Sequence, residues 1–271
     1  EIVHNHHVVD DLRAKGAIFI DDLDEVPRGS RLIYSAHGVS PQIREQAAAR
    51  GLAVIDATCP LVTKVHVEAV RMAKEDYDIV LIGHRGHVEV EGTMGHATDR
   101  MRLVETVDDV QQLDISNPER LGCVTQTTLS MDDTRDVMDA LQQRFPQIQL
   151  PRNDDICYAT QNRQNAVKKL AREADVIVVV GDPESSNSNR LVELGAKLGV
   201  RSFLLQSADD IEPEWLETAS CVGVTAGASA PEVLVEQVVA RLVELAPGTA
   251  RTEALPTVDE DISFKLPAAL R

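Results

Sequence analysis

The sequence repeats one pattern, an apolar run followed by a small polar turn and an amphipathic stretch, at intervals of about a hundred residues. Three segments show it most clearly: LIYSAHGVSPQIREQAAARG, GCVTQTTLSMDDTRDVMDALQQRF and CVGVTAGASAPEVLVEQVVARL. Short apolar runs bounded by turn residues indicate buried strands, and the amphipathic stretch after each turn indicates a helix. Such alternation favours parallel sheets whose carboxyl ends carry ligand-binding turns. We therefore predict an α/β fold.

Two further kinds of segment recur between these three. In VIDATCPLVTKVHVEAVRMA and DDICYATQNRQNAVKKLA, a cysteine stands between a short strand and a helix. In EIVHNHHVVDDLRAKG, IVLIGHRGHVEVEGTMG and VIVVVGDPESSNSNRLVELG, a polar cluster precedes a helix. Together they form a three-part cycle about a pseudo-threefold axis, with one cysteine missing. In chain order the turns centre on His4, His37, Cys59, His87, Thr127, Cys157, Asn187 and Ser229.

The spacing of this cycle predicts where the missing cysteine belongs. In the two complete cycles the cysteine precedes the polar cluster by about 28 and about 30 residues. A similar interval counted back from His4 ends about 25 residues upstream of Glu1, outside this chain. We therefore expect that upstream residues are missing. Three cysteines at helix starts would converge, as the ligands of a metal cluster must.

Cys59 lies in the stretch VIDATCPLVTKVHVEAV, where an apolar run turns amphipathic. Proline is tolerated at the first helical position, so Cys59-Pro60 predicts a helix start behind a buried strand. The positive end of the helix dipole favours a thiolate, the form of cysteine that acts as a nucleophile or metal ligand. The alternative is a small buried apolar residue at a strand–helix corner.

Charge and cysteine content narrow the function classes. The chain has 27 basic and 44 acidic residues, a net charge of −17, which argues against binding nucleic acid or an anionic membrane surface. The sequence has no transmembrane run or signal peptide, so we predict a cytoplasmic protein. Its four cysteines have no framework spacing and are expected to be free, catalytic or metal-bound. Of these, Cys123 and Cys221 lie in apolar runs and are predicted to be core residues.

The cluster GDPESSNSNRL indicates an anion site. A strand is predicted to end at Gly181 and a helix to begin near Asn189, with hydroxyls, amides and backbone N–H groups between them. The alternative is a Ser/Asn-rich capped helix start. The sequence lacks a Walker-type lysine and an aspartate pair for magnesium, so neutral and histidine donors are expected to hold the anion directly.

The loop GHRGHVEVEG carries two histidines and two glutamates after a buried strand. Its H-x-E spacing is typical of some zinc sites, but those need a matching cysteine pair that the sequence lacks. A general acid fits better. We expect Glu91 to be a structural or solvated charge, His84 to support the loop, and His66 to sit on a helix surface.

Eight motifs then resemble one family in order and spacing: EIVHN, SAHGVSP, DATCPLVTKVH, GHRGHVEVEGTMG, TQTTLS, DDICYATQNRQ, SSNSNRL and TAGASAPE. The chain resembles the 4-hydroxy-3-methylbut-2-enyl diphosphate reductases, the last enzymes of the methylerythritol phosphate route to isoprenoids. The resemblance implies three pseudo-threefold-related α/β domains in a trefoil around a central cavity. It implies a first domain at 1–59 completed by 230–271, a second at 60–153, a third at 154–229, and a C-terminal strap at 255–271 that returns to the first domain.

The resemblance also implies the roles of individual residues. Family members hold a [4Fe–4S] cluster by three cysteines, two of which correspond to Cys59 and Cys157; the third lies in a Gly-Phe-Cys-Ala-Gly-type motif that this chain does not contain. Glu89 corresponds to the proton donor, and His87 and Thr127 act with it on the substrate hydroxyl. The resemblance further implies that the substrate diphosphate is bound by His4, His37, Ser185, Ser186, Asn187 and Ser229.

The implied reaction is a reductive dehydration. Two electrons and two protons convert 4-hydroxy-3-methylbut-2-enyl diphosphate into isopentenyl and dimethylallyl diphosphates with release of water, and the electrons come from a carrier such as flavodoxin or ferredoxin. Two alternatives belong to other classes. One is a zinc hydrolase using His84 or His87 with Cys59, which the spacing disfavours. The other is a truncated, cluster-free diphosphate-binding protein without turnover.

Overall fold

The computed structural model describes residues 1–151, 155–256, 258, 260, 262–267 and 270–271. The chain separates into two compact units. Unit 1 comprises Glu1–Val3, Gly16–Cys157 and Ser263–Arg271, and unit 2 comprises His4–Lys15 and Tyr158–Ile262. The domain boundaries predicted from the sequence stay predictions.

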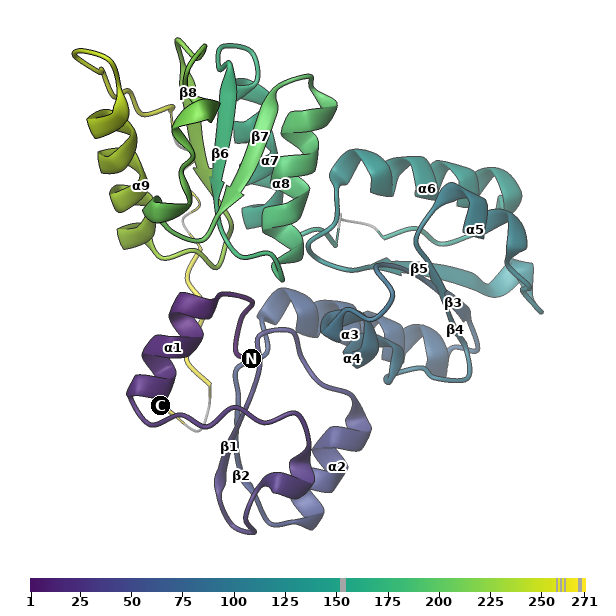
Figure 1. Ribbon diagram of the computed structural model, residues 1–271. Helices are drawn as coiled ribbons and strands as arrows, with labels where there is room; N and C mark the ends of the chain where they lie inside the picture. Colours follow the sequence, from purple (N-terminus) through teal and green to yellow (C-terminus); the bar gives the residue numbers. More distant parts are fainter. Residues whose placement is uncertain (152–154, 257, 259, 261, 268–269) are drawn as a thin grey trace. The chain divides into compact units, whose positions relative to one another are not determined.

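Unit 1 contains two parallel sheets (Figure 1). In the smaller sheet β1 pairs with β2, and in the larger sheet β3 lies between β4 and β5. The strands are β1 (Arg31–Tyr34), β2 (Ala53–Asp56), β3 (Asp78–Ile82), β4 (Met101–Val104) and β5 (Leu121–Thr125). The helices are α2 (Pro41–Ala49), α3 (Pro60–Lys74), α4 (Val88–Met94), α5 (Val107–Gln112) and α6 (Met131–Arg144), with short 3-10 turns η1 (Leu23–Glu25) and η2 (Pro118–Arg120).

Strand β3 forms the centre of unit 1 because both of its faces are buried. Val80 and Ile82 pack in one apolar cluster that includes Leu141 of α6. Ile79 and Leu81 pack in a second cluster with residues of α3. Successive side chains of a strand point to opposite faces, so a continuous apolar strand requires a helical layer on each side.

Unit 2 is built around one parallel sheet in the order β7-β6-β8. Alternate residues of β6 again pack into two apolar clusters, one with α9 and one with α7 and α8. The strands are β6 (Val176–Val180), β7 (Arg201–Leu205) and β8 (Val222–Ala226). The helices are α1 (His6–Ala14), α7 (Tyr158–Leu170), α8 (Ser186–Lys197) and α9 (Glu232–Leu245), with 3-10 turns η3 (Ala208–Asp210) and η4 (Pro213–Trp215).

The predicted α/β class is confirmed, with three parallel sheets. The helix predicted after Cys59 begins at Pro60. The helix expected near Asn189 begins three residues earlier, at Ser186, because the Ser185 side chain accepts the Ser188 N–H and caps it there.

The predicted strap at 255–271 includes residues 257, 259, 261, 268 and 269, which lie outside the described residues. Residues 262–267 form no strand. From Ser263 onward the chain groups with unit 1.

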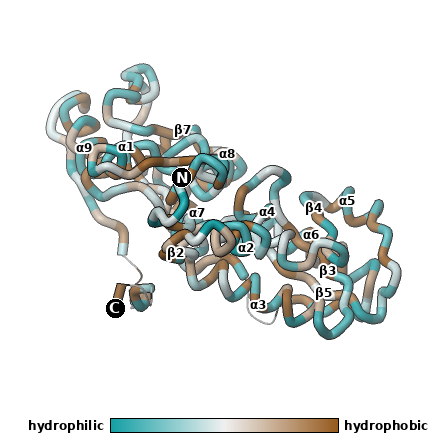
Figure 2. Tube along the Cα trace, turned by 90° about the horizontal axis from the view of Figure 1, so that it is seen from below, coloured by the Kyte–Doolittle hydropathy of each residue, from teal (hydrophilic) through white to brown (hydrophobic). Residues whose placement is uncertain are grey.

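The helices alternate between hydrophilic and hydrophobic residues along the chain (Figure 2). Within the described residues, no helix is both long enough and apolar enough to span a membrane.

Candidate functional site

The Cys59 thiol lies at the start of α3, and its backbone N–H donates to the Ala36 carbonyl at 3.0 Å. Burial raises the pKa of this thiol. The backbone N–H groups of Leu61 and Val62 oppose that effect, and the nearby Cys157 and Glu89 reinforce it. The half-buried sulfur therefore lies in unit 1 near a second thiol, a carboxyl group and the N–H groups of a helix start. Of these neighbours, only the N–H groups favour a thiolate, the form that binds a metal.

The backbone around Cys157 is fixed by β5 and the turn after it. The Cys157 N–H donates to the Thr127 carbonyl at 2.8 Å. Two residues earlier, the buried Asp155 carboxylate accepts the Thr125 N–H at 3.3 Å and contacts the Lys64 ammonium of α3 at 3.2 Å. Burial raises the pKa of Asp155, and Lys64 lowers it. The helix that begins beside Cys59 thus also anchors the segment that carries Cys157.

Glu89 and Thr127 form a buried pair. The Thr127 N–H donates to Oε1 of Glu89 at 2.7 Å, and its hydroxyl is 3.0 Å from Oε2. Glu89 is only 3% exposed, and burial raises its pKa to about 7 although both Thr127 contacts lower it. A carboxyl group with this pKa carries a proton in a large fraction of molecules at neutral pH, as a general acid must. Thr127 links this acid to the backbone of Cys157.

His87 is fixed beside this acid as the N-cap of α4. Its Nδ1 accepts the Glu89 backbone N–H at 3.2 Å, so in the neutral ring the proton is assigned to Nε2. The His37 ring stands edge-on to it, with the ring centroids 5.9 Å apart. Unit 1 therefore contains six of the predicted site residues: His37, Cys59, His87, Glu89, Thr127 and Cys157.

The turn that carries His37 depends on a glycine and on a buried histidine. Gly38 has φ +80°, and a Cβ added there would lie 2.6 Å from Cε1 of His66. His66 is only 4% exposed and stacks on His96 at 4.1 Å between ring centroids, so the prediction that it lies on a helix surface is wrong. Burial, with smaller effects of His96 and Arg44, lowers its pKa to about 4. Its spacing from the buried Val62 and Ala69 on α3 was the sequence signal for an inward position.

Unit 2 gathers the other predicted substrate residues at the ends of its strands. Ser185 caps α8, Ser186 is the first residue of that helix, and Asn187 follows, with only 3% of its surface exposed. Neither side-chain atom of the Asn187 amide has a hydrogen-bond partner among the described residues. A buried amide without a partner is costly, so this one is suited to a polar ligand group.

The turns before α1 and before α9 contact each other in the same unit. The Ser229 hydroxyl donates to the His4 carbonyl at 2.9 Å. A Cβ at Gly227, on the same turn as Ser229, would lie 3.6 Å from the Asn187 amide nitrogen, so the backbone of that turn closely approaches Asn187. His4, Ser229 and Asn187 therefore belong to one group of neighbouring loops in unit 2. His37, which was assigned to the same ligand, belongs to unit 1.

Two further polar residues that shape these loops, Asn5 and Gln126, were not predicted from the sequence. Asn5 caps α1 through a 3.1 Å contact from the Val8 N–H. The buried Gln126 accepts the His84 N–H at 2.9 Å and donates to the Thr128 hydroxyl at 2.9 Å. These are polar residues in turns, and their partners could not be identified from sequence spacing alone.

The two remaining cysteines have different environments. Cys123 is fully buried in β5, as predicted, and burial raises its pKa strongly. Cys221 is exposed, so the prediction that it is a core residue is wrong. It precedes β8, an edge strand. Its backbone N–H donates to the Asp175 carboxylate at 3.0 Å, and its carbonyl accepts the Asp175 backbone N–H at 2.9 Å.

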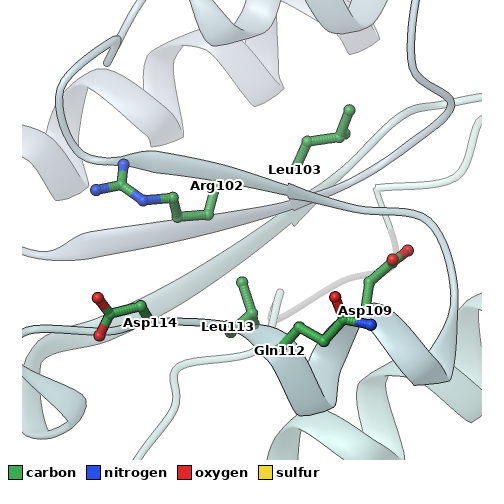
Figure 3. A pocket seen from close by; sticks show the side chains of 6 residues that line it. All are labelled: Arg102, Leu103, Asp109, Gln112, Leu113 and Asp114. Carbon is green, nitrogen blue, oxygen red and sulfur yellow. The ribbon is translucent and has the colours of Figure 1, made fainter.

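A hollow of about 250 Å³ lies between β4 and α5, and Figure 3 shows Arg102 and Asp114 at one end of it and Asp109 at the other. Asp109 is already used in the cap of α5. The hollow contains none of the predicted site residues.

Comparisons with known proteins converge on one family. A family model described as LytB protein matches residues 1–243. A 4-hydroxy-3-methylbut-2-enyl diphosphate reductase of Methylibium petroleiphilum is 56% identical over 270 residues, which span 100% of this chain and 82% of that protein. The enzyme of the same name from Dechloromonas aromatica is 58% identical over 270 residues, spanning 100% of this chain and 88% of that protein.

Two solved structures are also similar. The E-1-hydroxy-2-methyl-but-2-enyl-4-diphosphate reductase of Plasmodium falciparum matches with a TM-score of 0.92 and 43% identity, covering 99% of this chain and 85% of that one. A second structure, described as (E)-4-hydroxy-3-methyl-but-2-enyl diphosphate reductase, the terminal enzyme of the non-mevalonate pathway, matches with a TM-score of 0.62 and 34% identity, covering 90% of this chain and 86% of that one.

Proposed function

Because the chain belongs to the LytB family of 4-hydroxy-3-methylbut-2-enyl diphosphate reductases, we propose that it converts this allylic alcohol diphosphate into isopentenyl and dimethylallyl diphosphates. The observation that carries this proposal is the buried Glu89–Thr127 pair beside two free thiols. It combines a carboxyl group whose pKa burial raises to about 7 with two thiols that could bind a metal, in one unit.

Cys59 and Cys157 would hold an iron–sulfur cluster in unit 1. Both are free cysteines, they lie close enough for their charges to interact, and N–H groups beside Cys59 favour its thiolate. When bound, such a cluster supplies electrons one at a time and a Lewis-acidic iron for the substrate hydroxyl. A third cysteine ligand is not assigned to any residue of this chain.

The chain's own residues would supply the proton and the substrate contacts. Glu89 delivers a proton to the leaving hydroxyl, since expulsion of water has a much lower barrier than expulsion of hydroxide. Thr127 holds the Glu89 carboxyl group in place, and His87 Nε2 donates to the same hydroxyl. The diphosphate would be bound by His4, His37, Ser185, Ser186, Asn187 and Ser229.

The substrate is a small allylic diphosphate, and the electron donor is a small carrier such as flavodoxin or ferredoxin. With a net charge of −17, the chain would need a local basic patch to bind an acidic carrier. The cytoplasmic location stays a prediction.

The test is Glu89→Gln in the anaerobically reconstituted enzyme, with Glu91→Gln as the matched control. Both residues lie on α4, but Glu89 is buried and Glu91 is exposed. We expect Glu89→Gln to reduce turnover by at least about a hundredfold, because general acids contribute that much, while the substrate Kd stays within about threefold. Glu91→Gln should match the wild type. Normal turnover by Glu89→Gln would refute the proton-delivery assignment.

The unpartnered Asn187 amide supports a second candidate, a diphosphate-binding protein without a cluster. Calorimetry distinguishes the two: substrate binding without bound iron or turnover favours this candidate. The zinc hydrolase has no such support, since the cysteine pair that the H-x-E spacing would need is lacking from the sequence.

A further inference from the structure

We propose that Asp182 is a positioning residue for diphosphate binding, and that its carboxylate fixes the His4 turn against the loop between β6 and α8. This inference rests on the proposed function, because it takes His4 and Asn187 as diphosphate contacts. Asp182 itself needs no contact with the ligand.

The carboxylate of Asp182 joins three segments of unit 2. Its Oδ2 accepts the His6 backbone N–H at 2.9 Å and contacts the His6 ring at Nδ1. The same oxygen lies 3.3 Å from the Gln206 amide nitrogen, just after β7. Its Oδ1 accepts the Glu184 N–H at 2.9 Å and so shapes the loop that leads into α8. Asp182 is only 1% exposed, whereas the His6 ring that contacts it is half exposed, so water reaches these contacts only from the His6 side.

The charge of this carboxylate is balanced by its donors. Burial by itself raises the pKa of Asp182. The N–H groups of Glu184 and His6 and the His6 ring together lower it by more than burial raises it, so the net shift is downward. A carboxylate that is saturated with donors can stay ionised near an anion without the full repulsion of a bare charge. The contacts therefore explain why an acidic residue is compatible with a neighbouring diphosphate site.

The positions along the chain connect this contact to the ligand residues. His4 lies two residues before His6, and Ser185 lies three residues after Asp182. The Ser229 hydroxyl holds the His4 carbonyl from the β8–α9 turn. Without the Asp182 contacts, the start of α1 would lose these polar contacts with the β6–α8 loop, and the His4 turn would be held less firmly.

Asp175, at the other end of β6, provides a matched control. Its carboxylate also accepts two backbone N–H groups, those of Ser220 at 2.8 Å and Cys221 at 3.0 Å. It precedes Val176, the first residue of β6, whereas Asp182 follows the last one. Removing its charge also breaks carboxylate contacts to two backbone N–H groups in the same sheet, far along the strand from the proposed ligand loops, although Asp175 is exposed and Asp182 is buried.

The experiment measures binding of inorganic diphosphate and of substrate by calorimetry, together with KM, kcat and bound iron, for Asp182→Asn and Asp175→Asn. We expect Asp182→Asn to weaken both ligands and raise KM by about tenfold, the effect of losing one charged hydrogen bond. Its kcat and iron content should remain within about twofold of the wild type. Asp175→Asn should leave ligand affinity unchanged.

A second pair of variants tests the backbone contact without altering the buried carboxylate. His6 is the first residue of α1 and is half exposed, a position where proline is tolerated. His6→Pro removes both the N–H and the ring, and His6→Ala removes only the ring. We expect diphosphate affinity to fall more in His6→Pro than in His6→Ala.

Three outcomes overturn the inference. Equal affinity in Asp182→Asn and the wild type would refute it while leaving the proposed function intact, and equal losses in Asp182→Asn and Asp175→Asn would reduce Asp182 to a general structural role. A wild-type protein that binds neither inorganic diphosphate nor substrate would refute both the inference and the proposed diphosphate site.

Discussion

The candidate residues of unit 1 and unit 2 use opposite chemistry. In unit 1, burial changes the proton affinity of ionisable groups, raising the pKa of Glu89 and of the Cys59 thiol. In unit 2, the proposed ligand residues are mainly hydroxyls and an amide at a helix start, and the buried carboxylate of Asp182 beside that helix accepts several donors. Proton and electron transfer need desolvated ionisable groups, whereas an anion needs donors. Variants in the two units should therefore fail in different ways.

The largest difference should come from the thiols. Cys59→Ser or Cys157→Ser is expected to lose bound iron and to reduce turnover by more than about a hundredfold, since even changes behind metal ligands cost about 10–100-fold. Iron and acid-labile sulfide per chain after anaerobic reconstitution measure this directly. Cys221→Ser, at an exposed thiol, is the control and should retain both iron and turnover. Full iron content in Cys59→Ser would remove the metal assignment from unit 1.

In unit 2, Asn187→Asp should weaken substrate binding without loss of iron. The new carboxylate would replace a neutral amide with a negative charge beside the diphosphate, so we expect KM to rise about a hundredfold. Steady-state kinetics and iron analysis on the same preparation separate the two effects. A loss of iron equal to that of the thiol variants would contradict the division of labour between the units.

The raised pKa of Glu89 predicts a pH dependence that unit 2 should not share. Below about pH 7 the carboxyl group is protonated and able to donate, so kcat should fall as pH rises through 7, up to about tenfold per pH unit. The stability of the folded protein should also fall as pH rises. The folded state binds this proton more tightly than the unfolded state, so stability should decline between about pH 4.5 and 7 by up to about 3 kcal/mol.

Chemical denaturation across this pH range, for the wild type and Glu89→Gln, measures the effect. The variant cannot ionise at this position and should lose that part of the slope. An unchanged slope would mean that Glu89 already ionises at an ordinary pKa in the folded protein.

Much of unit 1 could be predicted because its signals are local. An apolar run followed by Cys59-Pro60 predicts both the end of a strand and the start of a helix. The spacing of His87 and Glu89 in the loop after β3 likewise indicates a candidate general acid, and both residues lie at the start of α4. The parallel sheets followed from the alternation of strands and helices. Each of these features depends on residues within a few positions of one another.

The errors involve residues whose surroundings come from distant parts of the chain. Asp182 resembles any turn aspartate, and its partner His6 is 176 residues away. His66 is buried because Gly38 allows the preceding turn to lie against it. Cys221 lies in an apolar stretch, but it stands just before the first residue of the edge strand β8, where its side chain is exposed. Sequence periodicity describes one face of an element and does not identify what packs against it.

The smallest expected effect concerns the turn that places His37 beside His87. Gly38→Ala should cost stability twice, through its φ of +80° and through a Cβ placed 2.6 Å from the His66 ring. Gly51→Ala is the matched control in the same unit, with φ +68° and no atom within 4 Å of the added Cβ. The left-handed backbone costs about 1–2 kcal/mol in both variants, so the excess in Gly38→Ala measures the contact with His66.

We expect that excess to be about 1 kcal/mol in denaturant unfolding, accompanied by a severalfold rise in KM as His37 shifts. Because His37 is the one proposed diphosphate contact in unit 1, this variant separates its two possible roles. A rise in KM with unchanged kcat would make His37 functionally similar to the residues of unit 2. A fall in kcat with unchanged KM would instead group His37 with His87 and Glu89. All the proposed residues of unit 1 would then act on the reaction step, and all those of unit 2 would bind the diphosphate.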